Sequence, residues 1–418
     1  MTVTIADIRA AAARFDTHVR RTPLLPSATL SAMLDAEVRL KAENLQRTGS
    51  FKIRGAITRI AALSADERAR GIIAASAGNH AQGVAIAAAA ARVHATIVMP
   101  VNAPLAKVQS TREYGAEIVL SGESYDEAAA EAGRIAAARR LVAIPAFDDP
   151  LVVAGQGTVG LEIVEDWPEV EAVVVPVGGG GLAAGVGVAA RALAPRTRLI
   201  GVQAEAAPGV KRSLAGGSQL IAPPAPTIAD GIAVGGPGHV TFPLLQRCID
   251  DIVTVAEDSI AQAMVLLLER SKLVVEGAGA AGAAALMSHA VDLSGKRVAI
   301  VLSGGNVDIN MLARVVEHGL TQAGRYVTLT VGLDDKPGQL AALTSVLSTT
   351  GANILSVAHH RFGIDLAVGR VQVVLLLEVR NRAHGDDVAR TLERSGFARR
   401  RGQTPEFVPA VWGSAEGR

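Results

Sequence analysis

Through the first part of the chain, short runs of β-branched and aliphatic residues alternate with longer alanine-rich segments of helical spacing. The predicted strands span residues 71–76, 95–99, 116–121 and 141–145, and the predicted helices span 81–93, 104–114 and 125–140. Units of this kind form a mostly parallel sheet that is covered by helices on both faces.

A second series of the same kind follows. It contains predicted strands at 171–177, 198–203 and 296–303, and predicted helices at 182–193, 259–271 and 307–321. Ligands of open α/β sheets bind beyond the carboxyl ends of the strands. We therefore expect an α/β fold in which two parallel-sheet lobes share one site.

The pattern changes after residue 325. Predicted strands follow at 326–333, 352–359, 370–379 and near 407–411, with predicted helices at 337–349 and 385–395. The order β-α-β-β-α-β is the ferredoxin-like plan. The prediction is a two-lobed first domain at 1–323, a second domain at 324–412 and a C-terminal tail at 413–418.

The composition narrows the class of protein. Of the 418 residues, 49% are hydrophobic, which argues against a disordered chain. The 41 basic and 40 acidic residues leave a net charge of +1, so we expect neither nucleic-acid nor membrane binding. The single cysteine, Cys248, cannot form an internal disulfide, and no apolar segment approaches the roughly 20 residues of a membrane span. These features favour a cytoplasmic protein.

The 43 glycines cluster in loops at the ends of predicted strands. One of these loops is Gly178-Gly179-Gly180-Gly181. Its amides can turn toward an anion, and the following helix adds the positive end of its dipole, so a phosphate group fits. A dinucleotide-binding turn is an alternative, because Gly178, Gly180 and Ala183 fit G-x-G-x-x-A and Glu205 lies at the later acidic position. A third alternative is packing alone.

Two further loops contain candidate chemistry. Lys52 follows Phe51 among small and apolar residues, which indicates partial burial. A buried lysine can form a Schiff base or take a proton, whereas a surface lysine is only solvated. The segment 76–80 (Ser-Ala-Gly-Asn-His) ends a predicted strand and begins a helix, so its amides suit a carboxylate. Ordinary capping by Ser76 or Asn79 is the alternative.

Four motifs occur together in one order: the segment around Lys52, residues 76–83 (SAGNHAQG), the glycine loop, and residues 303–306 (SGGN). Together they resemble the fold-type-II pyridoxal-phosphate enzymes, which have the tryptophan synthase β-like fold. The resemblance is strongest to the threonine dehydratases (threonine ammonia-lyases), and it extends from about residue 22 to residue 317. A nicotinamide site would explain neither Lys52 nor Ser303.

The resemblance implies a role for each matched residue. Lys52 would hold pyridoxal 5′-phosphate as a Schiff base and move the Cα proton of the substrate, with Phe51 beside the ring. The other cofactor contacts would be Asn79 at the ring oxygen, Ser303 at the pyridine nitrogen, and Gly178, Gly179, Gly180, Gly181 and Leu182 at the phosphate. The substrate carboxylate would lie among Ser76, Gly78, Asn79 and His80.

The resemblance also implies the reaction, an α,β-elimination that converts L-threonine to 2-oxobutanoate and ammonia, with conversion of L-serine to pyruvate as a side activity. One alternative is a dehydratase that prefers serine or threo-3-hydroxyaspartate. Another is a non-catalytic amino-acid sensor on the same fold, against which the intact Lys52 argues.

Two positions bear on the related serine racemases. These enzymes use a serine as the proton carrier on the opposite face, where this chain has Ala77, so dehydration is favoured. Glu205 matches one ligand of the racemase metal site, but Lys211 stands near the position expected for its acidic partner. We therefore predict no metal.

The segment from Arg325 onward resembles an ACT domain, a βαββαβ module that binds amino acids at paired interfaces. Residues 335–340 match its first loop, where Gly338 frees the backbone at a helix start. The resemblance implies the arrangement of catabolic-type dehydratases, an amino-acid effector, and a homodimer or homotetramer. The alternative is a dimerisation module without a ligand.

Overall fold

The computed structural model describes residues 2–15, 17–361 and 368–397. The chain divides into two compact units, Met1–Asp308 and Ile309–Arg418. Helix α14 (Ile309–Gln322) falls in the second unit, where it contacts β11, the first strand of that unit. The boundary predicted at 323/324 instead assigns this helix to the first domain. The strand predicted near 407–411 and the tail at 413–418 lie outside the described residues.

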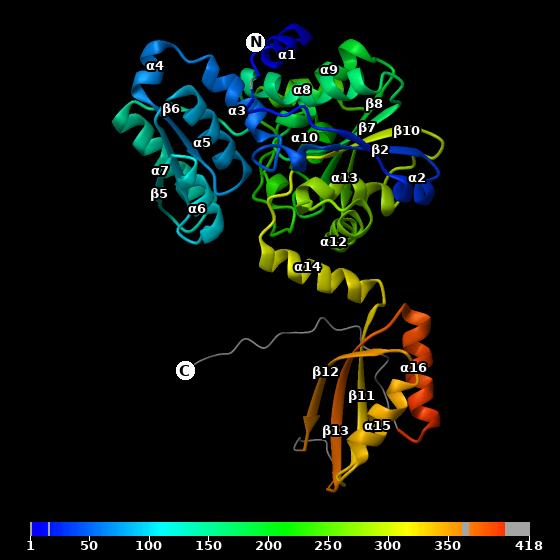
Figure 1. Cartoon of the computed structure of the whole chain (residues 1–418). Helices are drawn as coiled ribbons and strands as arrows, with labels where there is room; N and C mark the ends of the chain where they lie inside the picture. Colours follow the sequence, from blue (N-terminus) through cyan, green and yellow to red (C-terminus); the bar gives the residue numbers. More distant parts are fainter. Residues whose placement is uncertain (1, 16, 362–367, 398–418) are drawn as a thin grey trace. The chain divides into compact units, whose positions relative to one another are not determined.

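One lobe of the first unit is built on a four-stranded parallel sheet in the order β5-β4-β3-β6 (Figure 1). Its strands are β3 (Ile72–Ala75), β4 (Ala95–Met99), β5 (Glu117–Leu120) and β6 (Val142–Ala143). Its helices are α3 (Lys52–Ala61), α4 (Ala65–Arg70), α5 (Asn79–Ala91), α6 (Leu105–Glu113) and α7 (Tyr125–Arg139). The small side chains of α5 let it pack against both α3 and the sheet, so most of this helix is buried.

The other lobe contains a six-stranded sheet in the order β1-β2-β10-β7-β8-β9, in which only β1 is antiparallel. Its strands are β1 (Leu24–Pro26), β2 (Glu37–Ala42), β7 (Ala172–Pro176), β8 (Arg198–Ala204), β9 (Asp251–Val255) and β10 (Arg297–Leu302). Its helices are α1 (Ile5–Ala12), α2 (Ala28–Leu34), α8 (Pro150–Asp166), α9 (Gly181–Leu193), α10 (Gly209–Gly216), α11 (Thr241–Cys248), α12 (Glu257–Leu266) and α13 (Gly277–Met287). Two parallel-sheet lobes are therefore confirmed.

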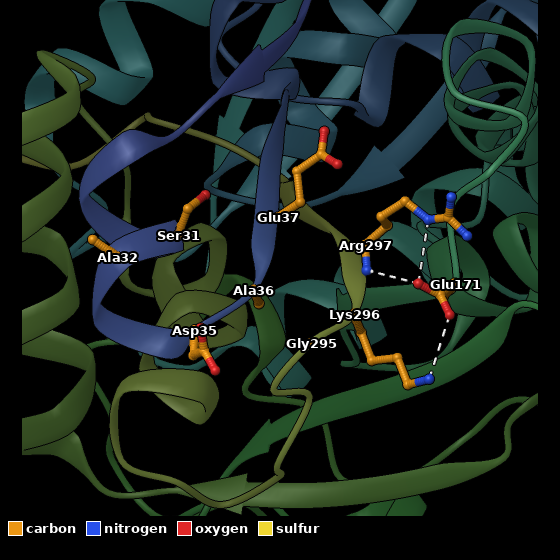
Figure 2. A pocket seen from close by; sticks show the side chains of 9 residues that line it. All are labelled: Ser31, Ala32, Asp35, Ala36, Glu37, Glu171, Gly295, Lys296 and Arg297. Atoms are coloured by element: carbon orange, nitrogen blue, oxygen red, sulfur yellow. Dashed lines mark hydrogen bonds and ion pairs between the residues drawn. The ribbon is translucent and has the colours of Figure 1, made fainter.

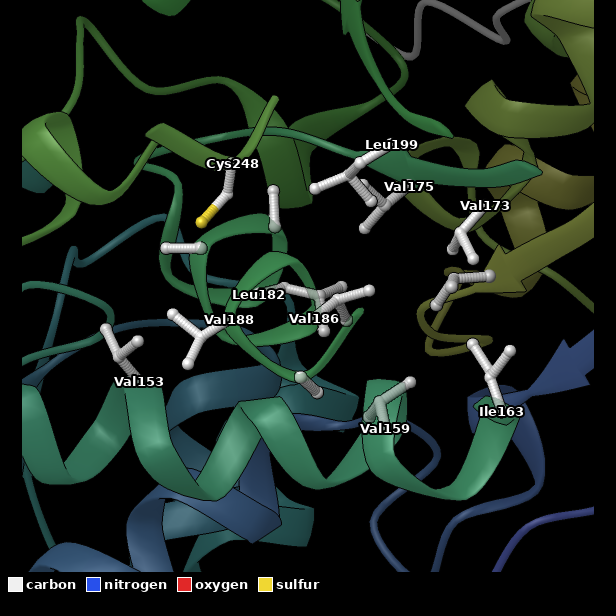
Figure 3. Packing of buried hydrophobic residues seen from close by; sticks show 14 of the residues in the cluster. Val153, Val159, Ile163, Val173, Val175, Leu182, Val186, Val188, Leu199 and Cys248 are labelled. Carbon is white, nitrogen blue, oxygen red and sulfur yellow. The ribbon is translucent and has the colours of Figure 1, made fainter. Parts of the chain in front are cut away.

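Helices α8 and α9 pack closely because glycines lie at their contact. A Cβ atom on Gly185 of α9 would lie 2.5 Å from the backbone nitrogen of Gly157 and from the carbonyl oxygen of Val153 on α8. Figure 3 shows the side chains of the apolar core around these helices, including Val153, Val159, Ile163, Leu182, Val186 and Val188. The glycines therefore allow the backbones of α8 and α9 to approach closely.

A buried ionic cluster connects β2, α3 and α8. The Arg54 guanidinium has no exposed surface, and it donates to Glu43 at 2.8 Å and to Glu162 at 2.6 Å. Lys41 also donates to Glu162 at 2.6 Å. Burial opposes ionisation of Glu162, but Arg54 and Lys41 outweigh this effect and hold the pKa of the Glu162 carboxyl below its usual range. The cluster fixes α3, whose first residue is Lys52.

The second unit contains a three-stranded antiparallel sheet in the order β11-β13-β12. Its elements, after α14, are β11 (Tyr326–Asp334), α15 (Gln339–Ser348), β12 (Asn353–His360), β13 (Arg370–Glu378) and α16 (Arg382–Arg394). Alternate residues of β11 and β13 are buried in one core with α15 and α16. The described elements have the predicted order β-α-β-β-α.

Within the described residues, no helix is long and apolar enough to cross a membrane.

Candidate active site

The predicted site residues lie in loops at the carboxyl ends of parallel strands, as expected for an open α/β sheet. Ser303 follows β10, Gly178 lies just after β7, and Ser76 follows β3. The loop before α3 pairs with the loop after β10, because the Phe51 amide donates to the Ser303 carbonyl at 3.1 Å. Lys52 and Ser303 are thereby brought to the same place.

Lys52 is the first residue of α3 and is partly buried. Its Nζ donates to the backbone carbonyl of Ala146 at 3.0 Å and lies 5.3 Å from the centre of the Phe51 ring. Burial lowers the pKa of Lys52 to about 8, although the negative charge of Glu276 opposes this shift. The amine is therefore poised to lose its proton near neutral pH.

The loop at residues 76–80 leaves the start of α5 open. Gly78 is the N-cap residue, and no side chain caps the helix, so capping by Ser76 or Asn79 is wrong. The Ser76 hydroxyl instead accepts a hydrogen bond from the Gly78 amide at 3.2 Å. Across the described ranges, nothing accepts from the amides of residues 79–81. A carboxylate would satisfy these donors.

The glycine loop has the same character at the start of α9. Gly180 is the N-cap residue and has a φ of +94°, a conformation that favours glycine. A Cβ atom on Gly179 would overlap the ring of Phe147. The Thr241 hydroxyl anchors the loop by donating to the Gly179 carbonyl at 2.7 Å. The amides of residues 179–183 have no acceptor in the described part of the chain.

The segment 144–148 connects these loops, and sequence analysis did not assign it any role. His80 Nε2 contacts the Ile144 carbonyl at 2.9 Å, and Lys52 contacts Ala146. The Phe147 ring packs against the glycine loop. Asp148 then accepts from the amides at the start of α11, including that of Val240 at 2.7 Å. No motif could identify this segment, because the Ile144 and Ala146 contacts are made by backbone carbonyls, which any residue type provides.

His80 is buried, and its side chain contacts the backbone of Ile144 in the loop that follows β6. Burial, together with the nearby charge of Lys52, lowers the pKa of His80 to about 4. The imidazole is therefore neutral at physiological pH, and it supports the loop near Lys52 rather than providing a positive charge.

Glu276 is a further site residue that the sequence analysis missed. Its Oε1 accepts from Asn79 Nδ2 at 2.7 Å, although the two residues are 197 positions apart in the chain. Asn306 Nδ2 in turn donates to Asn79 Oδ1 at 2.7 Å and to the Thr48 carbonyl at 2.7 Å. The only signal for Glu276 in the sequence is an acidic residue within the apolar segment before α13.

Ser303 is buried, and its hydroxyl forms no hydrogen bond within the described residues. The adjacent Ser50 hydroxyl is buried and has no hydrogen-bond partner there. A buried hydroxyl group is usually hydrogen-bonded, so Ser50 indicates an additional polar group in the site. A pyridine nitrogen is one acceptor that the Ser303 hydroxyl could serve.

These features together fit pyridoxal phosphate. The open amides at α9 suit a phosphate group, the Lys52 amine suits a carbonyl carbon, and the Ser303 hydroxyl suits a ring nitrogen. Backbone and side-chain contacts bring Lys52, Phe51, Asn79 and Ser303 together, and Phe147 joins the glycine loop to them.

A separate surface pocket lies at the opposite end of the large sheet (Figure 2). It surrounds the first residues of β2 and β10, where Lys296 and Arg297 both contact Glu171. Amino-terminal strand ends are not where ligands of such sheets bind, so this pocket is not the candidate site. Among the described residues, no group of three acidic, histidine or cysteine side chains could hold a metal ion.

Comparison with known proteins agrees with this geometry. Residues 15–304 match the family model described as pyridoxal-phosphate dependent enzyme. The chain belongs to this family. The chain is 48% identical over 395 residues to an L-threonine ammonia-lyase of Thermotoga maritima, covering 94% of this chain and 98% of that protein.

Solved structures of the family confirm the fold of the first unit. A threonine deaminase of Solanum lycopersicum is 37% identical, with a TM-score of 0.72 over 75% of this chain and 86% of that chain. A maize serine racemase is 35% identical, with a TM-score of 0.72 over 77% of this chain and 99% of that chain. The predicted fold-type-II architecture and the pyridoxal-phosphate cofactor are confirmed, and the nicotinamide alternative is wrong.

Proposed function

We propose that this chain is an L-threonine ammonia-lyase that converts L-threonine to 2-oxobutanoate and ammonia by α,β-elimination. The observation that carries the proposal is the placement of the Lys52 amine, which lies among Phe51, Ala146 and the Ser303 loop with a lowered pKa. The names of the closely related ammonia-lyase and deaminase support the choice of threonine.

Each loop has a task in this proposal. When bound, pyridoxal phosphate supplies an electron sink that makes the α-hydrogen of an amino acid acidic. The amides of the glycine loop and Leu182 hold its phosphate, Asn79 holds its ring oxygen, and the Ser303 hydroxyl faces its ring nitrogen. A hydroxyl is a neutral partner for that nitrogen and leaves the ring less electron-withdrawing than a carboxylate would. A less electron-withdrawing ring suits elimination over the chemistry of a long-lived carbanion.

The start of α5 orients the substrate. The open amides of residues 79–81 bind the substrate carboxylate, and Ser76 holds the loop through its bond to Gly78. Lys52 Nζ takes the proton from Cα, since its lowered pKa makes the neutral amine accessible near physiological pH. The β-hydroxyl leaves, so that water is lost, and hydrolysis of the product then consumes water and releases ammonia.

Ala77 favours elimination over racemisation. Its methyl group is partly buried and cannot return a proton to the opposite face of Cα. A racemase requires a second proton carrier there, so reprotonation of Cα is slow relative to loss of the hydroxyl group.

The second unit has a regulatory role in the proposal. Its β-α-β-β-α order and antiparallel sheet support an ACT domain that binds an amino-acid effector and pairs with a second copy. The chain then forms a homodimer or homotetramer. We also place the protein in the cytoplasm, where its substrate is available.

The test is release of keto acid and ammonia by the purified protein supplied with pyridoxal phosphate. L-Threonine, L-serine and threo-3-hydroxyaspartate are compared, and the highest kcat/KM is expected for threonine. Preference for another of the three would contradict the choice of substrate while retaining the elimination. Absence of turnover on all three would refute the proposed function and favour an amino-acid sensor.

A further inference from the structure

Glu276 lies inside the active site, yet the reaction proposed above gives it no task. The side chain is buried, and its Oε1 accepts from Asn79 Nδ2 at 2.7 Å. Glu276 is the N-cap residue of α13, but its carboxylate does not cap that helix. The carboxylate therefore serves the site rather than α13.

The backbone around Glu276 makes room for the carboxylate. A Cβ atom on Gly304 would overlap Glu276 Oε1, so a glycine is required beside it. The backbone N–H of Glu276 also donates to the Gly304 carbonyl at 3.0 Å, and the backbone N–H of Asn306 donates to the Glu276 carboxylate. The loop after β10 thus fixes Glu276 from both sides.

Glu276 and Asn306 together determine how the Asn79 amide is oriented. The Thr48 carbonyl requires a donor from Asn306, so Asn306 presents its Nδ2 to Asn79 Oδ1. Asn79 Nδ2 then faces Glu276. In the reverse orientation, Asn79 Oδ1 would face the carboxylate. One N–H of Asn79 Nδ2 is left, and no acceptor within the described ranges uses it.

The charges that face Glu276 come from three other elements. Lys52 lies on α3, Lys107 on α6 and Asp230 on the 3₁₀ turn Asp230–Ile232, and Lys107 contacts Asp230 at 3.4 Å. Burial and Asp230 raise the pKa of Glu276 to about 7, whereas Asn79 and Lys107 act in the opposite direction. Glu276 therefore changes its charge near neutral pH.

We propose that Glu276 is a positioning residue, which holds the Asn79 amide with one N–H directed to the cofactor ring and whose change of charge alters the electronic state of that ring. The proposal rests on the proposed function, from which the contact of Asn79 with the ring oxygen is taken. Ionised Glu276 also stabilises the positive charge that Lys52 acquires when it takes a proton.

The test follows the visible absorbance band of the holoenzyme between about pH 5 and about pH 9. The wild type is expected to show a spectral transition near the pKa of Glu276, about 7. In the Glu276→Gln variant, the amide oxygen still accepts from Asn79, so the band remains but this transition is lost. In Glu276→Ala the acceptor is missing, and cofactor affinity falls about tenfold.

Two variants outside the cofactor contacts test the charge directly. Asp230→Asn is expected to lower the pH of the transition, and Lys107→Gln is expected to raise it, because the two charges act on Glu276 in opposite directions. A merely structural role would produce no such opposite shifts.

Each result has a definite meaning. A Glu276→Gln variant that keeps the wild-type transition would overturn the proposal, as would shifts of equal direction in Asp230→Asn and Lys107→Gln. A wild-type protein that shows no visible band with added pyridoxal phosphate would instead refute the proposed function. Far-UV circular dichroism confirms that each variant is folded.

Discussion

The buried ionic cluster beneath Lys52 predicts that Arg54→Met strongly destabilises the first unit. Arg54 makes two hydrogen bonds to Glu43, at 2.8 Å each, and further bonds to Glu162 at 2.6 and 2.9 Å. Without Arg54, Glu162 still contacts Lys41, but among the described residues the Glu43 carboxylate retains only the Thr22 hydroxyl. One unpaired buried carboxylate remains.

The size of this effect follows from the desolvation of that charge. Removal of one partner from a buried ion pair costs about 3–5 kcal/mol, and methionine fills most of the lost volume, so we expect about 4 kcal/mol. Adding Glu43→Gln removes the unpaired charge and should restore about half of the loss. Glu43→Gln alone is the matched control.

Urea unfolding of the apo-protein measures these differences. The fluorescence of Trp167, which is buried at the end of α8, reports on the first unit when Trp412 is replaced by phenylalanine. A loss below about 1 kcal/mol for Arg54→Met, the range of an exposed pair, would refute the reasoning. Failure of the double variant to recover stability would also refute it.

Three further predictions concern the loops and their support. Gly185→Ala should lower the free energy of unfolding by about 1–3 kcal/mol or more, because its methyl group would overlap the backbone of α8; an unchanged urea midpoint would contradict this packing. Gly179→Ala should weaken binding of pyridoxal phosphate at least about tenfold, because displacement of Phe147 shifts the loop; equilibrium titration measures this, and wild-type affinity would contradict it. Acidification should destabilise the apo-protein as the pH falls from 6.5 to about 4, since unfolded His80 binds a proton that the folded state excludes. The shift corresponds to about 3 kcal/mol, and the loss should be smaller in His80→Gln; equal pH dependence in both proteins would disprove the assignment.

The sequence predicts the smaller lobe well, because its units are short and strongly periodic. The strand at 95–99 coincides with β4, and the helix at 125–140 differs from α7 by one residue. Helix α8 was not predicted. Its glycine- and valine-rich segment is buried nearly all round and therefore lacks an amphipathic pattern. Strand β2 was also missed, since its lysine and arginine obscure the apolar pattern of a strand that has a neighbour on each side in the sheet.

The residues of the candidate site likewise divide into those that the sequence predicts and those that it misses. Lys52, the glycine loop and Ser303 could be found because each lies in a short local motif, and the structure joins the Lys52 and Ser303 loops. Glu276 and the segment 144–148 act through contacts between distant parts of the chain. Such contacts arise only when these distant parts of the chain are folded together, so local spacing contains no signal for them.

The central claim is that Lys52 binds pyridoxal phosphate covalently in a lyase. Borohydride reduction of the holoenzyme, followed by peptide mass mapping, tests this claim most directly. The account predicts one modified peptide, containing Lys52, and no modification in Lys52→Ala, which should also lose turnover of threonine while remaining folded. Modification of another lysine, or full activity of Lys52→Ala, would contradict the account.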